Sequence, residues 1–263
     1  MVNFHVHTFR CHHAEGDAEA YVRAAQEQGL TTVGFSDHTP LPDNHWKSIR
    51  MHPDELPGYC TEVRRAAADH PEITVFLGLE CEYDPAYVEY YQKVLLEKHQ
   101  VDFLAGGAHW FPWRGKRLSL YDELETASHL AAYAEHLIAS MESGLFAYIA
   151  HPDFFARSYT DWDENAAAAS RDIIAAAAAT GTPLEINTNG FRKDPIQSAA
   201  GPRPGYPLPA FWEMAAEHQV AVVVNSDAHR PEDVGALSEG LALAEQVGLV
   251  PLDLSRRLQN LPG

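Results

Sequence analysis

Short apolar runs alternate with longer amphipathic stretches along almost the whole chain, and this alternation constrains the fold more than any other feature. Runs such as VAVVVNS and ITVFLGLE are apolar on both faces, as are strands of a parallel sheet covered by helices. The predicted strands span residues 2–7, 31–36, 73–80, 101–109, 146–151, 183–187 and 220–226. Helical segments are predicted at 17–29, 54–69, 85–98, 126–142, 163–180, 207–218 and 231–247. These β/α units indicate an α/β fold with a closed or nearly closed barrel.

The length of the chain suits one such barrel. At 263 residues, a single domain over 1–263 is expected, because α/β barrels of this size form one unit. Glycines fall where four of the predicted helices should stop, at Gly29, Gly144, Gly181 and Gly248. Long irregular segments are expected at 39–53, 110–122 and 188–206. Loops of that length in a compact domain usually act as lids or binding loops.

Charge and composition exclude several classes of protein. With 19 basic and 37 acidic side chains the net charge is -18, which disfavours nucleic acid as a partner. No apolar run is long enough to cross a bilayer, and no basic stretch precedes the first strand, so no membrane or signal segment is expected. Cys11, Cys60 and Cys81 cannot form a disulfide framework. A cytoplasmic location is therefore predicted.

Each predicted strand ends in side chains that can bind a metal ion. They are His5 and His7, Asp37 and His38, Glu80, His109, His151, Glu185 and Asn187, and Asp227 and His229. In β/α barrels the active site lies at the carboxyl ends of the strands, so these groups should share one rim. Imidazoles and carboxylates suit zinc, iron(II) or manganese. Two or three clustered ions are expected, a type of site that can catalyse phosphoryl displacement.

The N-terminal stretch FHVHTFRCHHAEG allows two metal sites. Cys11, His12 and His13 could form a small structural zinc site. His5 and His7, which are two residues apart in the sequence, could instead be ligands on one face of a strand. The rest of the chain favours the second interpretation, since the other strand-end ligands lie far away in the sequence.

A series of motifs resembles the polymerase and histidinol phosphatase (PHP) superfamily, and most closely its histidinol-phosphate phosphatases. In chain order the motifs are FHVHT, GFSDHTP, GLECEY, GGAHW, IAHPDF, EINTNGFRK and NSDAHRPEDVG, from about residue 3 to residue 240. The resemblance implies a distorted (β/α)7 barrel that binds three divalent metal ions, Zn²⁺, Fe²⁺ or Mn²⁺, at its C-terminal rim.

The resemblance also implies a set of ligands for each ion. One metal would take His5, His7, Glu80 and Asp227, and Glu80 would bridge to a second metal held by His109 and His151. The third would take His13, His38 and His229. Cys11 and His12 are left outside the ligand set, and Cys11 is expected only to pack.

Further candidates surround these ligands. Asp37 could accept a hydrogen bond from a ligand imidazole or carry a proton, and a structural cap is an equal alternative. Arg157, Arg192 and Arg230 each follow a strand-end motif and could bind phosphate. The resemblance favours Arg192, because FRKDP resembles the GLRK-type loop of the phosphatases. Trp110, Phe111 and Trp113 could contact a substrate, but covering the barrel rim is the favoured role.

The predicted function is that of a metal-dependent phosphomonoesterase. The resemblance favours a histidinol-phosphate phosphatase of histidine biosynthesis, in which a metal-activated hydroxide attacks phosphorus and releases L-histidinol and phosphate. Glu80, Asp37 and His229 are the predicted catalytic residues. Alternatives are a related enzyme for another small phosphate ester and an inactive metal-binding regulatory barrel.

Overall fold

The structure is a computed structural model that describes residues 1–259 and contains two compact units. The first unit comprises Met1–Ala105, Asn225–Leu237 and the chain from Asp253 onward. The second comprises Gly106–Val224 and Ser238–Leu252. The single domain expected over 1–263 stays a prediction.

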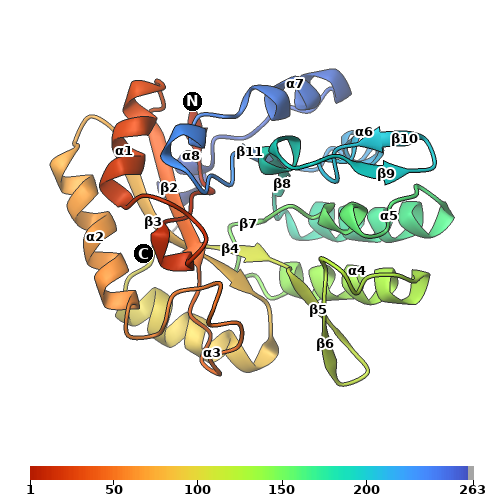
Figure 1. Ribbon diagram of the computed structural model, residues 1–263, viewed down its shortest axis with the longest axis horizontal. Helices are drawn as coiled ribbons and strands as arrows, with labels where there is room; N and C mark the ends of the chain where they lie inside the picture. Colours follow the sequence, from red (N-terminus) through yellow and green to blue (C-terminus); the bar gives the residue numbers. More distant parts are fainter. Residues whose placement is uncertain (260–263) are drawn as a thin grey trace. The chain divides into compact units, whose positions relative to one another are not determined.

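The first unit contains parallel strands that pair in the order β1-β2-β3-β4 (Figure 1). Their bounds are β1 Val2–Asn3, β2 Thr32–His38, β3 Thr74–Glu82 and β4 Phe103–Gly107. Figure 1 shows α1 (Ala18–Glu27) and α2 (Leu56–Asp69) along one side of β2 and β3. The remaining helical segments are η1 Phe9–Cys11, η2 Pro85–Tyr87, α3 Val88–Tyr90, η3 Tyr91–Lys98, η6 Pro231–Asp233 and α8 Leu254–Gln259.

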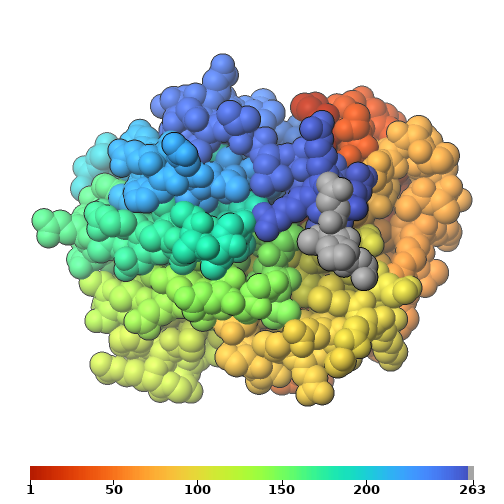
Figure 2. Space-filling model, turned by 180° about the vertical axis from the view of Figure 1, so that it is seen from behind, coloured from red at the N-terminus to blue at the C-terminus, as the bar shows by residue number. Residues whose placement is uncertain are grey.

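In the second unit the strand order is β4-β7-β8-β11, and β11 ends at a residue of the first unit. The strands are β7 Tyr148–Ile149, β8 Leu184–Asn187 and β11 Val222–Asn225. The helices are α4 Ala127–Glu142, α5 Glu164–Thr180, α6 Pro209–Glu217 and α7 Ser238–Val247, with short turns η4 Phe154–Arg157 and η5 Thr188–Arg192. Figure 2 shows α4 and α5 side by side on the surface, in shades of green.

Two segments predicted to be irregular form antiparallel hairpins instead. Within 110–122, β5 (Trp110–Trp113) pairs with β6 (Lys116–Ser119). Within 188–206, β9 (Ile196–Ser198) pairs with β10 (Gly201–Arg203). The prediction was wrong here because the local pairing of each hairpin does not require the long apolar runs by which the other strands were found.

The predicted strand over residues 2–7 forms regular pairing only at Val2–Asn3. Beyond it, side chains replace the backbone as hydrogen-bond acceptors: Phe4 N donates to Asn225 Oδ1 and His5 N donates to Asn3 Oδ1. Val6 then forms an isolated bridge with Ala228. The chain therefore stays extended through His5 and His7 without belonging to a ladder.

The predicted helices are present, with differences at two of them. Residues 85–98 are helical, but Tyr91–Lys98 form the wider π-type turn. Within 231–247 the α-helix begins only at Ser238. All four glycines proposed as helix ends have positive φ, from 67° at Gly144 to 79° at Gly248, which is the left-handed conformation of a C-terminal cap.

Burial of the strands agrees with the doubly covered sheet that their composition predicts. All seven residues of β2 are buried, as are those of β8 and β11. In the first unit, the aromatic rings of Phe4, Phe76 and Phe103 pack together beneath β2 and β3. A side chain at Gly78 would lie 2.2 Å from Phe103, so this strand position has room only for glycine. This core fixes the strand ends that carry the polar side chains.

Candidate metal centre

Four side chains of the first unit bring one donor atom each into a small region. His7 Nε2 lies 3.1 Å from Asp227 Oδ1 and 3.7 Å from Glu80 Oε2. His5 Nε2 lies 3.6 Å from the same Asp227 oxygen and 3.5 Å from the same Glu80 oxygen. Two ligands that bind a tetrahedral zinc ion at about 2.1 Å lie roughly 3.4 Å apart. The spacing of these four atoms therefore fits one divalent ion.

Backbone pairing explains why ligands so distant in the sequence meet. His7 N donates to Ala228 O, and Ala228 N donates to His5 O, so the segment after β11 is held beside the N-terminal strand. On the other side, the parallel register of β2 and β3 places His38 opposite Glu80. Asp227 has φ of 48°, a left-handed conformation that is rare outside glycine and is found preferentially at functional sites.

The protonation of this group depends on its acids. Burial lowers the pKa of His7, but the carboxylates of Asp227 and Asp37 outweigh burial and raise it to about 9. Burial raises the pKa of Asp227, yet the imidazoles of His5 and His7 bring it well below its ordinary value. Both ring nitrogens of His7 are buried without hydrogen-bond geometry to any described residue. An imidazole placed beside carboxylates in this way is suited to coordinate a cation.

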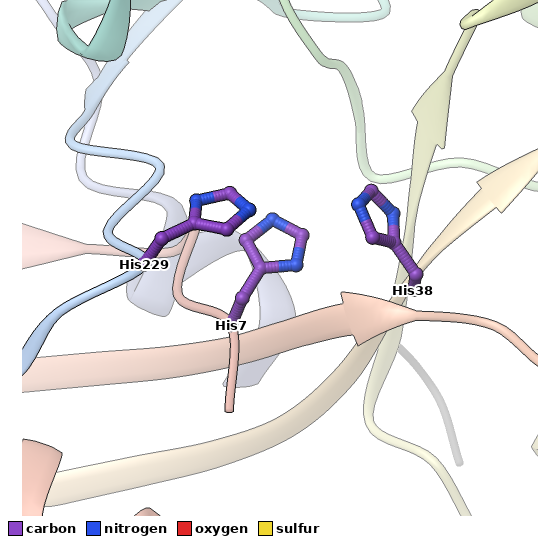
Figure 3. Close-up of side chains that lie close together, drawn as sticks. All are labelled: His7, His38 and His229. Carbon is purple, nitrogen blue, oxygen red and sulfur yellow. The ribbon is translucent and has the colours of Figure 1, made fainter. Parts of the chain in front are cut away.

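A second group of imidazoles lies beside the first. The ring centroid of His13 lies 4.9 Å from that of His229 and 5.3 Å from that of His38. Figure 3 shows the rings of His7, His38 and His229 converging from three segments. His38 Nδ1 is also 3.0 Å from Glu80 Oε2, so Glu80 contacts both groups.

The ring nitrogens of His13 and His229 are placed so that a cation could bind to both. His13 Nδ1 lies 2.7 Å from Cys11 O, and His229 Nδ1 lies 3.1 Å from Asp227 O. With both Nδ1 atoms donating to carbonyls, both Nε2 atoms carry lone pairs, and these two atoms face each other at 3.1 Å. Two lone pairs at that distance repel unless a proton or a metal ion lies between them. The pair therefore fits a metal site of the carbonyl–histidine–metal type.

The carboxylate of Asp37 lies on the Nδ1 side of the His7 ring. Its Oδ1 is 3.7 Å from His7 Nδ1 and accepts a hydrogen bond from His38 N. Its Oδ2 accepts hydrogen bonds from the backbone N–H and the hydroxyl of Thr8. Asp37 is fully buried. These contacts favour a role in orienting His7 over a role as proton carrier.

Cys11 and His12 differ from their neighbour His13. The Cys11 thiol is buried, and burial raises its pKa far above the ordinary range, so the thiolate that would bind a metal is disfavoured. His12, with φ of 67°, turns its ring toward Glu55 and His52. The geometry thus supports the choice of His13 from this pair.

The second unit holds the two remaining predicted ligands. The rings of His109 and His151 lie 5.0 Å apart at 62°. The carboxylate of Glu185 accepts hydrogen bonds from His151 N and from the side-chain amide of Asn187. His151 has φ of 33°. Glu185 and Asn187, predicted from their position as possible ligands, thus brace the backbone of His151. The bridge predicted from Glu80 to these histidines joins residues of different units and stays a prediction.

The three predicted phosphate-binding arginines have different surroundings. Arg157 ends η4 and packs against Gly205. Arg192 ends η5 and donates a hydrogen bond to Thr188 Oγ1. Arg230 lies in the first unit, where it forms an exposed ion pair with Glu15 at 3.5 Å. Such a pair can form at any surface, so the structure gives Arg230 the weakest support of the three.

Comparisons with known proteins identify the family of the chain. The model of the family described as PHP domain matches residues 3–189. The chain belongs to the PHP domain family. A Deinococcus radiodurans protein named "Probable histidinol-phosphatase" is 31% identical over 89% of this chain and 88% of its own. A Schizosaccharomyces pombe protein of the same name is 25% identical, over 89% of this chain and 82% of its own.

A solved PHP structure shows the same fold. It is that of histidinol phosphate phosphatase from Lactococcus lactis, complexed with zinc, L-histidinol and phosphate. The TM-score is 0.75 with 18% sequence identity, over 95% of each chain. The predicted distorted (β/α)7 barrel and the resemblance to the histidinol-phosphate phosphatases are therefore confirmed.

Two residues of the second unit, Tyr121 and Arg203, were not among the predicted site residues. Trp110 and Phe111 are buried, as the rim-covering role predicted, but Tyr121 at the end of the same segment lies next to His109. Arg203 donates hydrogen bonds to four backbone carbonyls, those of Ala156, Thr160, Pro204 and Gly205. Neither residue follows one of the predicted strands, because the hairpins that carry them lie in segments predicted to be irregular.

Proposed function

We propose that this chain is a metal-dependent phosphomonoesterase that hydrolyses histidinol phosphate to L-histidinol and phosphate. The observation that carries the proposal is the set of facing donor atoms in the first unit, with His7 Nε2 3.1 Å from Asp227 Oδ1 and His13 Nε2 3.1 Å from His229 Nε2. The names of the relatives agree with this chemistry. A regulatory barrel without activity would have no need to keep both groups.

The metals would be held by three sets of side chains. One ion would bind His5, His7, Glu80 and Asp227, and another would bind His13, His38 and His229. His109 and His151 would hold a further ion. Zn²⁺, Fe²⁺ and Mn²⁺ all suit this mixture of imidazoles and carboxylates. Such ions lower the pKa of water and neutralise the charge of phosphoryl oxygens.

The protein's own groups would position the reaction. Glu80 is buried and contacts His5, His7 and His38, so its carboxylate would hold these imidazoles together and balance the positive charge. Asp37 would fix the orientation of His7. His229 would stay neutral, because burial and nearby His7 lower its pKa to about 3. Arg157 and Arg192 would bind the non-bridging oxygens of the phosphate as bidentate donors.

The location and the partners of the protein remain predictions. In the part of the chain from 1 to 259, no helix combines the length and apolar character needed to cross a membrane. Inorganic phosphate and a small phosphate ester are the expected partners, without nucleic acid. The cytoplasmic location rests on the sequence alone.

Phosphate release from a panel of phosphate esters tests the proposal. The zinc-, iron- or manganese-loaded protein should hydrolyse histidinol phosphate with the highest kcat/KM, above sugar phosphates and nucleotides. Arg157→Gln or Arg192→Gln should raise KM by about tenfold or more, since each removes a charged donor, whereas Arg230→Gln should change it by less than about threefold. A preference for another ester would instead support the related-phosphatase alternative, and tight metal binding without turnover would support the regulatory barrel.

A further inference from the structure

We propose that Tyr121 forms the base of a subsite for a flat heteroaromatic ring, which gives the enzyme its preference for a phosphate ester of an imidazole-bearing alcohol. This inference rests on the proposed function, which names the phosphate ester but no residue that recognises its ring.

Tyr121 combines exposure with proximity to the second unit's predicted ligands. Its ring is parallel to that of His109 within 10°, with centroids 6.2 Å apart. Its side chain is 52% exposed, whereas Phe154 and Tyr206 in the same cluster are 3% exposed each. A large aromatic side chain left half in water beside a candidate metal ligand can gain from a ring that covers it.

The ring of Tyr121 packs against the buried ring of Phe154. Phe154 meets it edge-on, with centroids 5.0 Å apart at 77°, and Tyr206 packs on Phe154 at 4.9 Å. This edge-to-face arrangement is the favoured geometry of aromatic pairs. The Tyr121 ring thus lies at the border of a buried aromatic cluster, in contact with Phe154.

The backbone of Tyr121 is also fixed. Ser158 Oγ lies 2.7 Å from Leu120 O and 3.0 Å from Tyr121 O, so its hydroxyl can donate to either carbonyl. Leu120 N donates to His109 O at 2.9 Å, which ties the end of the β5–β6 hairpin to the candidate ligand itself. Because the ring is already held, binding a second ring costs little conformational entropy.

The neighbours of Tyr121 connect the ring subsite to phosphate binding. Ser158, which holds its carbonyl, follows Arg157 directly in the chain, and Arg157 is a proposed phosphate ligand. In histidinol phosphate only a few bonds separate the phosphate from the imidazole ring. One substrate of that size can therefore place its phosphate near Arg157 and the proposed metal ligands while its imidazole lies on Tyr121. Aliphatic phosphate esters have no ring to stack and would gain nothing there.

The test compares two substrates in three variants. The measured quantity is the ratio of kcat/KM for histidinol phosphate to kcat/KM for glycerol phosphate, with the zinc-loaded protein. Tyr121→Leu should lower this ratio about tenfold, mostly through KM, because it removes the stacking surface. Tyr121→Phe keeps the ring and should stay within about twofold of wild type. Trp162→Leu, at an exposed aromatic elsewhere in the unit, should leave the ratio unchanged.

A binding measurement separates this inference from the proposed function. L-histidinol is titrated into the zinc-loaded protein and the imidazole proton resonances are followed by NMR, since a ring stacked on tyrosine shifts upfield. The shift should appear in wild type and Tyr121→Phe and vanish in Tyr121→Leu. An unchanged ratio together with an unchanged shift in Tyr121→Leu overturns the subsite. If wild type hydrolyses neither ester, the proposed function fails, and the NMR shift alone decides on the subsite.

Discussion

The two units of this protein hold different kinds of polar group. In the first unit, imidazoles and carboxylates face one another at 3.1–3.7 Å, and the carboxylates of Asp227 and Asp37 raise the pKa of His7. In the second, His109 and His151 lie among Tyr121, Phe154 and Tyr206, with arginines on the adjoining turns. From this difference we propose that the first unit contributes most of the metal ligands, while the second combines His109 and His151 with the groups that would recognise the substrate.

The largest effect should come from Glu80, whose carboxylate contacts the imidazoles of His5, His7 and His38. Glu80→Gln removes a negative charge that lies 3.0–3.7 Å from three histidine nitrogens. We expect kcat to fall about a thousandfold and the bound metal to decrease. Phosphate release measures kcat, and mass-spectrometric metal analysis measures the amount of bound metal. Glu97→Gln, at an exposed glutamate of η3, serves as the control, and equal activity in the two variants would contradict the assignment.

A substitution in the second unit should affect stability more than metal binding. Asp153 is buried, and its Oδ2 accepts hydrogen bonds from Leu208 N and Trp212 Nε1. Asp153→Ala leaves both donors buried without an acceptor and should lower the free energy of unfolding by about 3 kcal/mol. Burial raises the pKa of Asp153 to about 6, so the neutral Asp153→Asn should be tolerated better. Urea denaturation compares them, and an equal loss in both variants would contradict this explanation.

The adjacent pair His12 and His13 offers a matched test of the first unit. His13→Ala removes an imidazole whose Nε2 faces that of His229, and it should weaken the affinity for one metal ion by about tenfold to a hundredfold. His12→Ala should leave all metal affinities within about twofold, since the His12 ring lies against Glu55 and His52. Isothermal titration calorimetry with zinc measures the metal affinities of the two variants. A larger loss in His12→Ala would reverse the assignment.

A smaller effect should appear in the pH dependence of metal binding. The pKa of His7 is about 9 in the metal-free protein, so His7 carries a proton at neutral pH that an ion must displace. Zinc affinity should therefore rise about tenfold per pH unit between pH 7 and pH 8.5. The metal-free fold should show the opposite trend, because the stability that protonated His7 contributes below pH 6.5 is lost as the pH rises through 9.

Competition with a chromophoric chelator measures how zinc affinity changes with pH. Thermal denaturation of the metal-free protein measures how its stability changes with pH. His229 should not contribute, because its pKa of about 3 keeps it neutral over the whole range. A zinc affinity that does not change with pH would contradict the protonation of His7.

The regular elements could be predicted because their periodicity is local. Apolar runs such as those of β2 and β8 are buried on both faces, and glycines such as Gly181 end helices in the conformation that only glycine adopts at little cost. The hairpins within 110–122 and 188–206 were missed, since short pairs with exposed faces carry no such periodicity. The π-type turn at Tyr91–Lys98 likewise leaves no mark in the spacing of apolar residues.

For the site, the sequence by itself predicted the types of candidate ligand and their places at the strand ends, because parallel strands direct those ends to one edge. The sequence also separated His13 from Cys11 and His12, but only through its resemblance to a family. Tertiary structure alone decided which atoms face each other: the Nδ1 hydrogen bonds that leave the Nε2 atoms of His13 and His229 opposed, and the contact of Asp37 with His7. The surroundings of Tyr121 were also decided by tertiary structure, since its partner Phe154, and Tyr206 that packs on Phe154, come from other segments of the chain. Such contacts depend on long-range packing, and no local sequence pattern encodes them.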